Sequence, residues 1–194
     1  MKIGILALQG DFHEHQVCFN KLNVETQLVR SVSDLNLCDS LVIPGGESTT
    51  ISKLLNISNL DSEIIIKSKN GMPLWGTCAG LILISDKIIE EDPSPLKLIN
   101  VKTSRNFYGR QVDSFVEKID LFSDEIEFEA IFIRAPKIIE IGKNVDILAT
   151  TNNNSPVAVQ SKNILGTTFH PELTDDLRIH QHFIEMISNK NLIK

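Results

Sequence analysis

Apolar runs and stretches with one apolar face alternate along the first half of the chain. The apolar runs predict strands at Lys2 to Leu8, Val24 to Arg30, Leu41 to Ile43 and Pro73 to Trp75. Apolar residues at helical spacing predict helices at Phe12 to Leu22, around Ile51 to Leu55, at Leu60 to Lys69 and after Gly80. This alternation predicts an α/β fold with a doubly wound, mostly parallel central sheet. Such sheets bind ligands outside the carboxyl ends of their strands, so the glycine-containing loops after the strands should face one cleft.

Short β-rich segments replace this alternation after about Ile99. They are Val112 to Ile119, Phe128 to Ile133, Asp146 to Thr151, Val157 to Ser161 and Ile164 to Phe169. We expect these segments to be antiparallel additions to the same domain, and Asp176 to Asn189 to close the chain as a helix. Because no segment is long enough for an interdomain linker, the sequence predicts a single domain over residues 1–194.

Composition narrows the classes of partner. A net charge of −6 with no basic stripe argues against nucleic acid as the main partner. No apolar run approaches the roughly 20 residues of a membrane span, so we expect no membrane partner. Three cysteines and no signal-peptide cleavage pattern favour a reducing, cytoplasmic setting.

The first candidate for chemistry is Cys78, which is flanked by Gly76 and Gly80 directly after an apolar strand. This is the pattern of a strand-to-helix elbow that exposes a nucleophile at the start of a helix. The turn is so tight that we expect a strained backbone at Cys78 and glycines where the chain passes itself. The helix dipole favours a thiolate there. A structural cysteine at a tight junction is the alternative.

The second candidate is the pair His170 and Glu172, which follows a predicted strand. Pro171 disfavours helical geometry at His170, so we expect an extended tripeptide in which both side chains share one face. The carboxylate could then hold one ring nitrogen and leave the other free to act as a base. A histidine at a strand end beside a solvated glutamate is the alternative.

The third candidate is the loop that begins Pro44-Gly45-Gly46-Glu47-Ser48. Backbone N–H groups of Gly45 and Gly46, together with that of Ala79, could form an oxyanion hole opposite the nucleophile. A plain turn with Ser48 or Thr49 as the helix N-cap is the alternative. A phosphate-binding loop is excluded because no Gly-Lys-Ser/Thr follows.

Other polar residues are less decisive. An arginine could grip a substrate carboxylate or form a structural ion pair, and the candidates are Arg105, Arg110 and Arg134. Asp11 is placed to cap the first helix. Two pairs of histidines are spaced by two within predicted helices, where residues two apart do not share a face. We interpret them as surface or packing residues and expect neither a metal site nor a cofactor; they are His13, His15, His180 and His182.

Together the elbow, the Gly-Gly loop and the His-Pro-Glu segment resemble a class I, triad-type glutamine amidotransferase. Three further stretches resemble the glutaminase subunits of ribose-5-phosphate-dependent pyridoxal 5'-phosphate synthases: Leu6 to Gly10, Arg105 to Phe115 and Phe132 to Pro136. The similarity covers nearly the whole chain and implies a flavodoxin-like architecture.

This resemblance implies a role for each candidate. Cys78 would be the nucleophile, His170 the base and Glu172 the residue that orients it. The glutamine site would be lined by Gly46, Glu47, Ser48, Arg105, Ile133 and Arg134. The implied activity is hydrolysis of L-glutamine to L-glutamate and ammonia, which passes to a synthase subunit that builds pyridoxal 5'-phosphate. The resemblance also implies weak activity without that partner, whose docking would order the oxyanion loop.

Three other functions remain open at this point. The chain could be the glutaminase of another pathway, such as histidine biosynthesis. It could be a peptidase or chaperone-like thiol protein with a cysteine elbow, which would leave Glu172 and Arg134 without a role. It could also be a non-catalytic regulatory module on the same scaffold, although all three triad residues are present.

Overall fold

The strands of the computed structural model form one large sheet and one small one, and the model describes residues 1–105, 114–122 and 126–192. The large sheet has nine strands in the order β2-β1-β3-β4-β12-β11-β10-β7-β8. The first five strands in that order are parallel to one another, and each later strand is antiparallel to its neighbour. Their bounds are β1 Lys2–Leu6, β2 Glu25–Val29, β3 Ser40–Ile43, β4 Leu74–Thr77, β7 Phe115–Leu121, β8 Phe128–Phe132, β10 Asp146–Thr150, β11 Pro156–Ser161 and β12 Ile164–Thr167.

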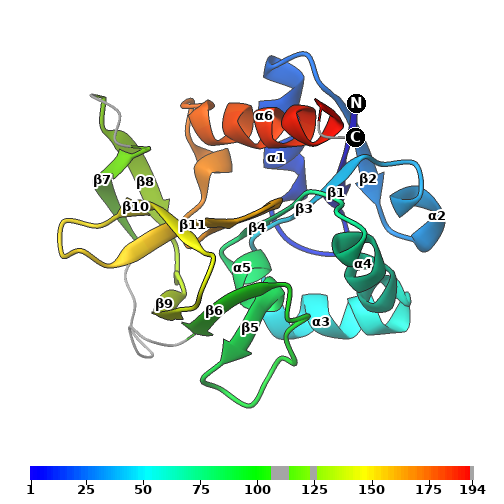
Figure 1. The fold of residues 1–194 in the computed structure, drawn as a ribbon, viewed down its shortest axis with the longest axis horizontal. Helices are drawn as coiled ribbons and strands as arrows, with labels where there is room; N and C mark the ends of the chain where they lie inside the picture. The colour runs from blue at the N-terminus through cyan, green and yellow to red at the C-terminus, as the bar shows by residue number, and fades with distance from the viewer. Residues whose placement is uncertain (106–113, 123–125, 193–194) are drawn as a thin grey trace.

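Helices cover both faces of this sheet (Figure 1). On one face, α1 and α6 pack against the sheet through Phe19 and Phe183, around the fully buried Trp75. On the other face, the remaining helices bury Leu35, Ile51, Ile64 and the apolar run of α5. The helices are α1 Phe12–Lys21, α2 Val32–Leu35, α3 Ser48–Ile57, α4 Leu60–Lys69, α5 Ala79–Ile84 and α6 Arg178–Leu192. The predicted α/β fold with a mostly parallel sheet and antiparallel additions is confirmed. The segment that begins at Ile164 was wrongly expected to be one of these additions, because as β12 it pairs parallel with β4.

A three-stranded sheet lies beside α5 and was not predicted. Its order is β5-β6-β9, and its strands are β5 Ser85–Ile88, β6 Ile99–Ser104 and β9 Lys137–Ile141. These strands are short and contain polar residues, so they lack the continuous apolar run that marks a buried strand. The sheet packs Ile99, Val101 and Ile138 against the core on the side of α5.

The predicted elements otherwise match with shifted ends. The strand predicted from Val112 to Ile119 is seen as β7, which continues to Leu121, and its first two residues and Arg110 lie outside the described residues. The helix after Gly80 is short, because Ser85 ends it and its hydroxyl donates to the Leu81 carbonyl at 2.7 Å. Within the described residues, none of the helices is both long enough and apolar enough to cross a membrane.

Candidate active site

The elbow has the geometry that its sequence predicts. Cys78 lies between β4 and α5 with φ +47°, a left-handed conformation that is strained for a residue with a side chain. The flanking glycines are needed for space, because a Cβ at Gly80 would overlap the Ile43 carbonyl oxygen and one at Gly76 would lie 2.6 Å from the Gly80 backbone. The Cys78 side chain is nearly buried, and its thiol donates to the Ile133 carbonyl at an S–O distance of 3.8 Å.

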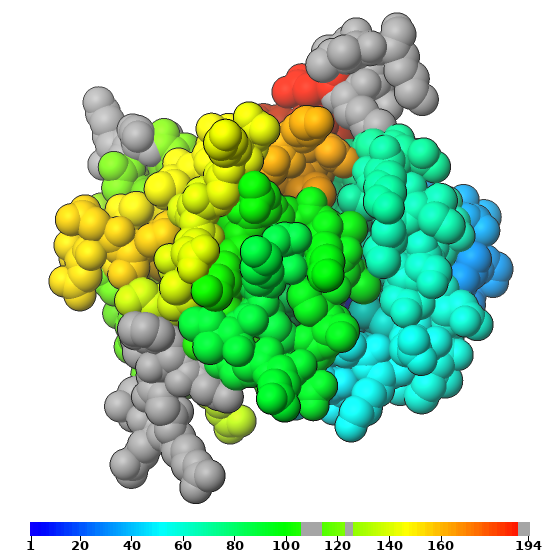
Figure 2. Space-filling view, turned by 60° about the horizontal axis from the view of Figure 1, so that its bottom comes forward, coloured from blue at the N-terminus to red at the C-terminus, as the bar shows by residue number. Residues whose placement is uncertain are grey.

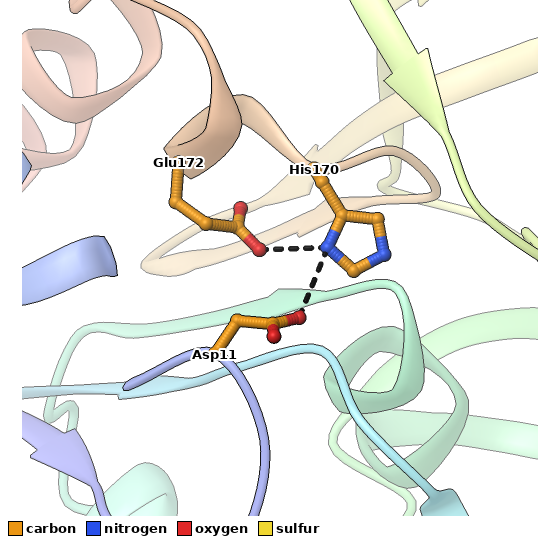
Figure 3. Close-up of side chains that lie close together, drawn as sticks. All are labelled: Asp11, His170 and Glu172. Atoms are coloured by element: carbon orange, nitrogen blue, oxygen red, sulfur yellow. Dashed lines mark hydrogen bonds and ion pairs between the residues drawn. The ribbon is translucent and has the colours of Figure 1, made fainter. Parts of the chain in front are cut away.

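The structure brings His170 and Glu172 together, although not in the predicted conformation. Pro171–Leu173 forms a turn of 3-10 helix directly after His170, so the tripeptide is not extended. The two side chains still meet because the turn brings the Glu172 carboxylate back beside the imidazole (Figure 3). The Nδ1–Oε1 distance is 2.7 Å, and both residues are almost fully buried. The second ring nitrogen of His170 points away from the carboxylates (Figure 3).

Asp11 is a further acidic neighbour of this pair. It occupies the N-cap position of α1, but its side chain makes no capping hydrogen bond, so the predicted capping role is wrong. Its Oδ2 instead lies 3.4 Å from Nδ1 of His170, on the same nitrogen that Glu172 engages (Figure 3). The Asp11 backbone N–H donates to the Gly45 carbonyl at 3.1 Å, which ties the first loop to the Gly-Gly loop.

Charge and burial act in opposite directions on His170. Burial alone lowers its pKa, but hydrogen bonding with the side chains of Asp11, Cys78 and Glu172, together with the Glu172 charge, raises the pKa well above its usual value. Burial raises the pKa of Glu172, and the bond to His170 opposes that rise. The imidazole therefore holds its proton beside the Glu172 carboxylate.

The Gly-Gly loop lies against His170. A Cβ added at Gly45 would overlap Cε1 of that imidazole, so only glycine fits there. Gly46 has φ +150°, and the next N–H, that of Glu47, donates to Oε1 of Gln9 at 2.8 Å. The loops after β1, β3 and β4 therefore converge as predicted for the carboxyl ends of parallel strands.

Glu47 caps the helix that follows this loop. Its carboxylate accepts hydrogen bonds from the backbone of Thr49 and Thr50, so the N-cap is Glu47 and neither Ser48 nor Thr49. Ser48 is buried in the first position of α3. Partial burial opposes ionisation of Glu47, but the hydrogen bonds from Thr49 and Thr50 prevail and lower its pKa to about 2.

Arg105 joins this loop to the small sheet. Its guanidinium lies 3.1 Å from Oε1 of Glu47 and donates to the Asp92 carbonyl at 2.8 Å. A groove of about 610 Å³ is lined by α3 residues between Thr49 and Ile57 and by Asp92 to Ser94. Figure 2 shows this side of the molecule, with α3 and α4 (cyan to blue-green) beside the green segment that carries β5 and β6. The groove is lined by none of Cys78, His170 and Glu172.

The remaining predicted site residues that the structure describes are Ile133, Arg134 and Ala79. Ile133 contacts Cys78 through its carbonyl, as described above, and Arg134 follows it with φ +44° and an exposed side chain. Ala79 is the first residue of α5 and is buried, so its N–H is among the first-turn donors that the helix itself leaves unpaired. The backbone N–H of Cys78 already donates to the Thr167 carbonyl at 2.8 Å.

Sequence reasoning missed two residues near the centre, Asp11 and His15. His15 is completely buried on α1, with Nε2 3.4 Å from Oε2 of Glu172. Its placement agrees with the interpretation as a packing residue, but its partners are polar. The signal for Asp11 was its position in the loop after the first strand, which faces the cleft.

The three side chains in Figure 3 could in principle hold a cation, because ligand atoms of Asp11, His170 and Glu172 all lie within 4.8 Å of one another. In this arrangement Nδ1 of His170 faces both carboxylates at hydrogen-bonding distance. A protonated Nδ1 satisfies these oxygens without a metal, and the expectation of no metal remains a prediction.

A cysteine on a strained elbow, beside a histidine held by a glutamate at the edge of an α/β sheet, is the arrangement of the class I glutamine amidotransferases. Solved structures agree with this assignment. A crystal structure of a glutamine amidotransferase matches with a TM-score of 0.90 and 39% identity, covering 96% of this chain and 98% of that one. The structure of PurLQS from Thermotoga maritima, at 13% identity and a TM-score of 0.69 over 97% of this chain and 98% of its own, shares the fold.

The chain belongs to the SNO glutamine amidotransferase family, whose model matches residues 5–189. It is 48% identical to the pyridoxal 5'-phosphate synthase subunit PdxT of Thermosipho africanus, over 96% of this chain and 99% of the relative. It is 49% identical to the subunit of the same name from Dictyoglomus turgidum, over 97% of this chain and 100% of the relative. The resemblance inferred from the motifs is therefore confirmed at the level of the family.

Proposed function

We propose that this chain hydrolyses the side-chain amide of L-glutamine through Cys78, His170 and Glu172, and that it passes the ammonia to a pyridoxal 5'-phosphate synthase subunit. The observation that carries the proposal is the held imidazole. Glu172 occupies Nδ1 at 2.7 Å, which leaves the other ring nitrogen of His170 to exchange protons with the sulfur and the substrate. Synthase subunits among the relatives support this pathway over histidine biosynthesis.

The reaction begins with attack of the Cys78 sulfur on the amide carbon of glutamine, which forms a C–S bond and places negative charge on the amide oxygen. Backbone N–H groups of Gly45, Gly46 and Ala79 are the proposed donors to that oxygen. His170 then gives its proton to the amide nitrogen, the C–N bond breaks, and ammonia leaves a glutamyl thioester. A water that loses a proton to His170 attacks the thioester and releases glutamate and the thiol.

Recognition of the substrate is assigned to the residues that surround the sulfur. Glu47 and Arg105 form an ion pair beside the Gly-Gly loop, where they offer one charge of each sign to the amino-acid end of glutamine. The Ile133 carbonyl contacts the sulfur directly after β8, Arg134 follows it in the chain, and Gly46 and Ser48 complete the proposed site. Three free thiols, at Cys18, Cys38 and Cys78, support a reducing cytoplasmic location.

The test is glutamate release from glutamine by the full chain in the presence of the synthase subunit. Cys78→Ala should abolish release, and Cys38→Ala should not, because Cys38 is a half-buried thiol whose pKa burial raises to about 11. An electrophilic glutamine analogue should add to Cys78 alone, as read by peptide mass. Retention of glutaminase activity by Cys78→Ala would refute the assignment.

A further inference from the structure

A line of buried polar contacts runs from Glu172 into the core, away from His170. Nε2 of His15 lies 3.4 Å from Oε2 of Glu172 and 3.3 Å from the Thr77 hydroxyl. Nδ1 of the same ring lies 3.2 Å from Nε2 of His180 on α6. Both imidazoles are fully buried, between α1, α6 and the sheet, against Trp75. The mechanism proposed above uses neither histidine.

Both rings are neutral at physiological pH. Burial lowers the pKa of His180 to about 3, and burial together with the neighbouring histidines lowers the pKa of His15 well below its usual value. A neutral imidazole carries one N–H and one bare nitrogen. The contact between the rings therefore needs one donor and one acceptor, which allows two arrangements.

The surroundings select one of them. If His15 donated from Nδ1, its bare Nε2 would face the Glu172 carboxylate, and the N–H of His180 would be at Nδ1, which has no hydrogen-bond partner among the described residues. A buried N–H without an acceptor is rare and costly. In the other arrangement His180 donates from Nε2, His15 carries its proton on Nε2, and the atom left unpartnered is only a lone pair.

We propose that His15 is a positioning residue for this reaction, whose Nε2–H faces Oε2 of Glu172 and holds that carboxylate ionised, with Oε1 toward His170. The proposal rests on the function proposed above for Glu172 and His170. Oε2 is buried and has no other hydrogen-bond partner among the described residues, so we assign the Nε2–H of His15 as the dipole that offsets its burial; Nε2 lies 3.4 Å from Oε2 and 3.3 Å from the Thr77 hydroxyl, which shares this N–H. His180 has a supporting role, because its N–H fixes the tautomer of His15.

The other titratable groups that face Glu172 do not take this place. His170 engages Oε1, and Asp11 is a carboxylate that faces His170. The Cys18 thiol contacts the Glu172 backbone carbonyl at 3.7 Å, and burial raises the pKa of that thiol to about 11. Loss of the His15 N–H should therefore let Glu172 take up a proton at higher pH, and His170 would lose the carboxylate that orients it.

The first test reads the tautomers of the full chain without a substitution. Nitrogen-15 shifts and ring couplings should show His15 and His180 both protonated on Nε2 and bare on Nδ1. Observation of His15 protonated on Nδ1 would overturn the proposal whatever the variants do.

The second test is the pH dependence of glutaminase activity in the complex with the synthase subunit. His15→Leu should lower kcat about tenfold or more, with the KM for glutamine nearly unchanged, and should move the acid limb of the kcat profile to higher pH. His15→Gln, which restores an N–H donor near Oε2, should recover most of both effects. His13→Leu, an exposed change on the same helix, should alter neither.

The outcomes separate this inference from the triad itself. An equal decrease of kcat in His15→Leu and His15→Gln, without a shift of the pH profile, would mean that His15 acts only through packing. That result would overturn the proposal. If His15→Leu folds and keeps the wild-type kcat while Glu172→Gln loses activity, the proposal for His15 is overturned and the proposed function stands. Full activity in Glu172→Gln would instead refute the proposed function on which the inference depends.

Discussion

The buried ring of His180 should make the fold sensitive to acid in a way that can be measured. Burial lowers its pKa from 6.5 to about 3. Because the folded-state pKa is the lower one, the stabilising contribution is complete above pH 6.5 and is lost as the pH falls toward 3. In that interval the unfolded chain binds a proton that the folded chain refuses. One such histidine should lower the free energy of unfolding by about 2 kcal/mol between pH 7 and pH 5.

The variant His180→Phe keeps an aromatic ring against Trp75 and Phe19 but removes both nitrogens. Urea unfolding gives the free energy of unfolding at pH 7 and at pH 5. Between these pH values, this free energy should fall by about 2 kcal/mol less in the variant than in the wild type. Comparing differences cancels any constant cost of the lost contact to His15. His13→Phe, whose ring is exposed, is the matched control and should lose as much as the wild type. An identical loss in His180→Phe and wild type would refute the buried, neutral state of His180.

Three further predictions concern the candidate active site. Glu172→Gln should lower kcat by about 10²- to 10⁴-fold with a small change in KM, because the imidazole loses its charged partner; a decrease below tenfold in a steady-state assay would contradict this. Gly45→Ala should reduce kcat without a large change in unfolding free energy, because the added Cβ displaces the His170 ring; unchanged kcat would show that the ring has room. Glutamate release should rise when the synthase subunit is added, because the Gly45–Gly46 peptide can reorient cheaply, and equal rates with and without it would contradict a partner-ordered oxyanion hole.

The elbow could be predicted from sequence because its determinants are local. Gly76, Cys78 and Gly80 lie within five residues, and their spacing reports a backbone that must pass itself, which the overlap of a Gly80 Cβ with Ile43 confirms. The pairing of His170 with Glu172 was also predictable in outcome. The predicted extended conformation was wrong. Pro171 restricts only the residue before it, and a proline is compatible with the first turn of a helix, which here begins at Pro171.

Contacts between distant segments could not be predicted in the same way. Helical spacing places His15 on a face of α1, but it does not say that α6 supplies His180 or that β4 supplies Thr77. The prediction for Asp11 used the preference of aspartate for N-cap positions. In the structure its side chain contacts His170 and makes no capping hydrogen bond. Two strands of the small sheet, β5 and β9, each bury only one residue and so show no strand pattern, and β6 carries polar residues between and after its two buried apolar ones.

The register between β4 and β12 is what joins the nucleophile to its base. These strands are parallel, with Thr77 opposite Thr167, so both chains leave the sheet at the same edge. The N–H of Cys78 then donates to the Thr167 carbonyl at 2.8 Å, and the N–H of His170 donates to Ile131 of β8 at 2.8 Å. A slip of one residue would turn every side chain of β12 to the opposite face. Backbone pairing therefore sets the positions of Cys78 and His170 relative to each other. Side-chain contacts such as that of Glu172 then orient the imidazole on a backbone that this pairing has already positioned.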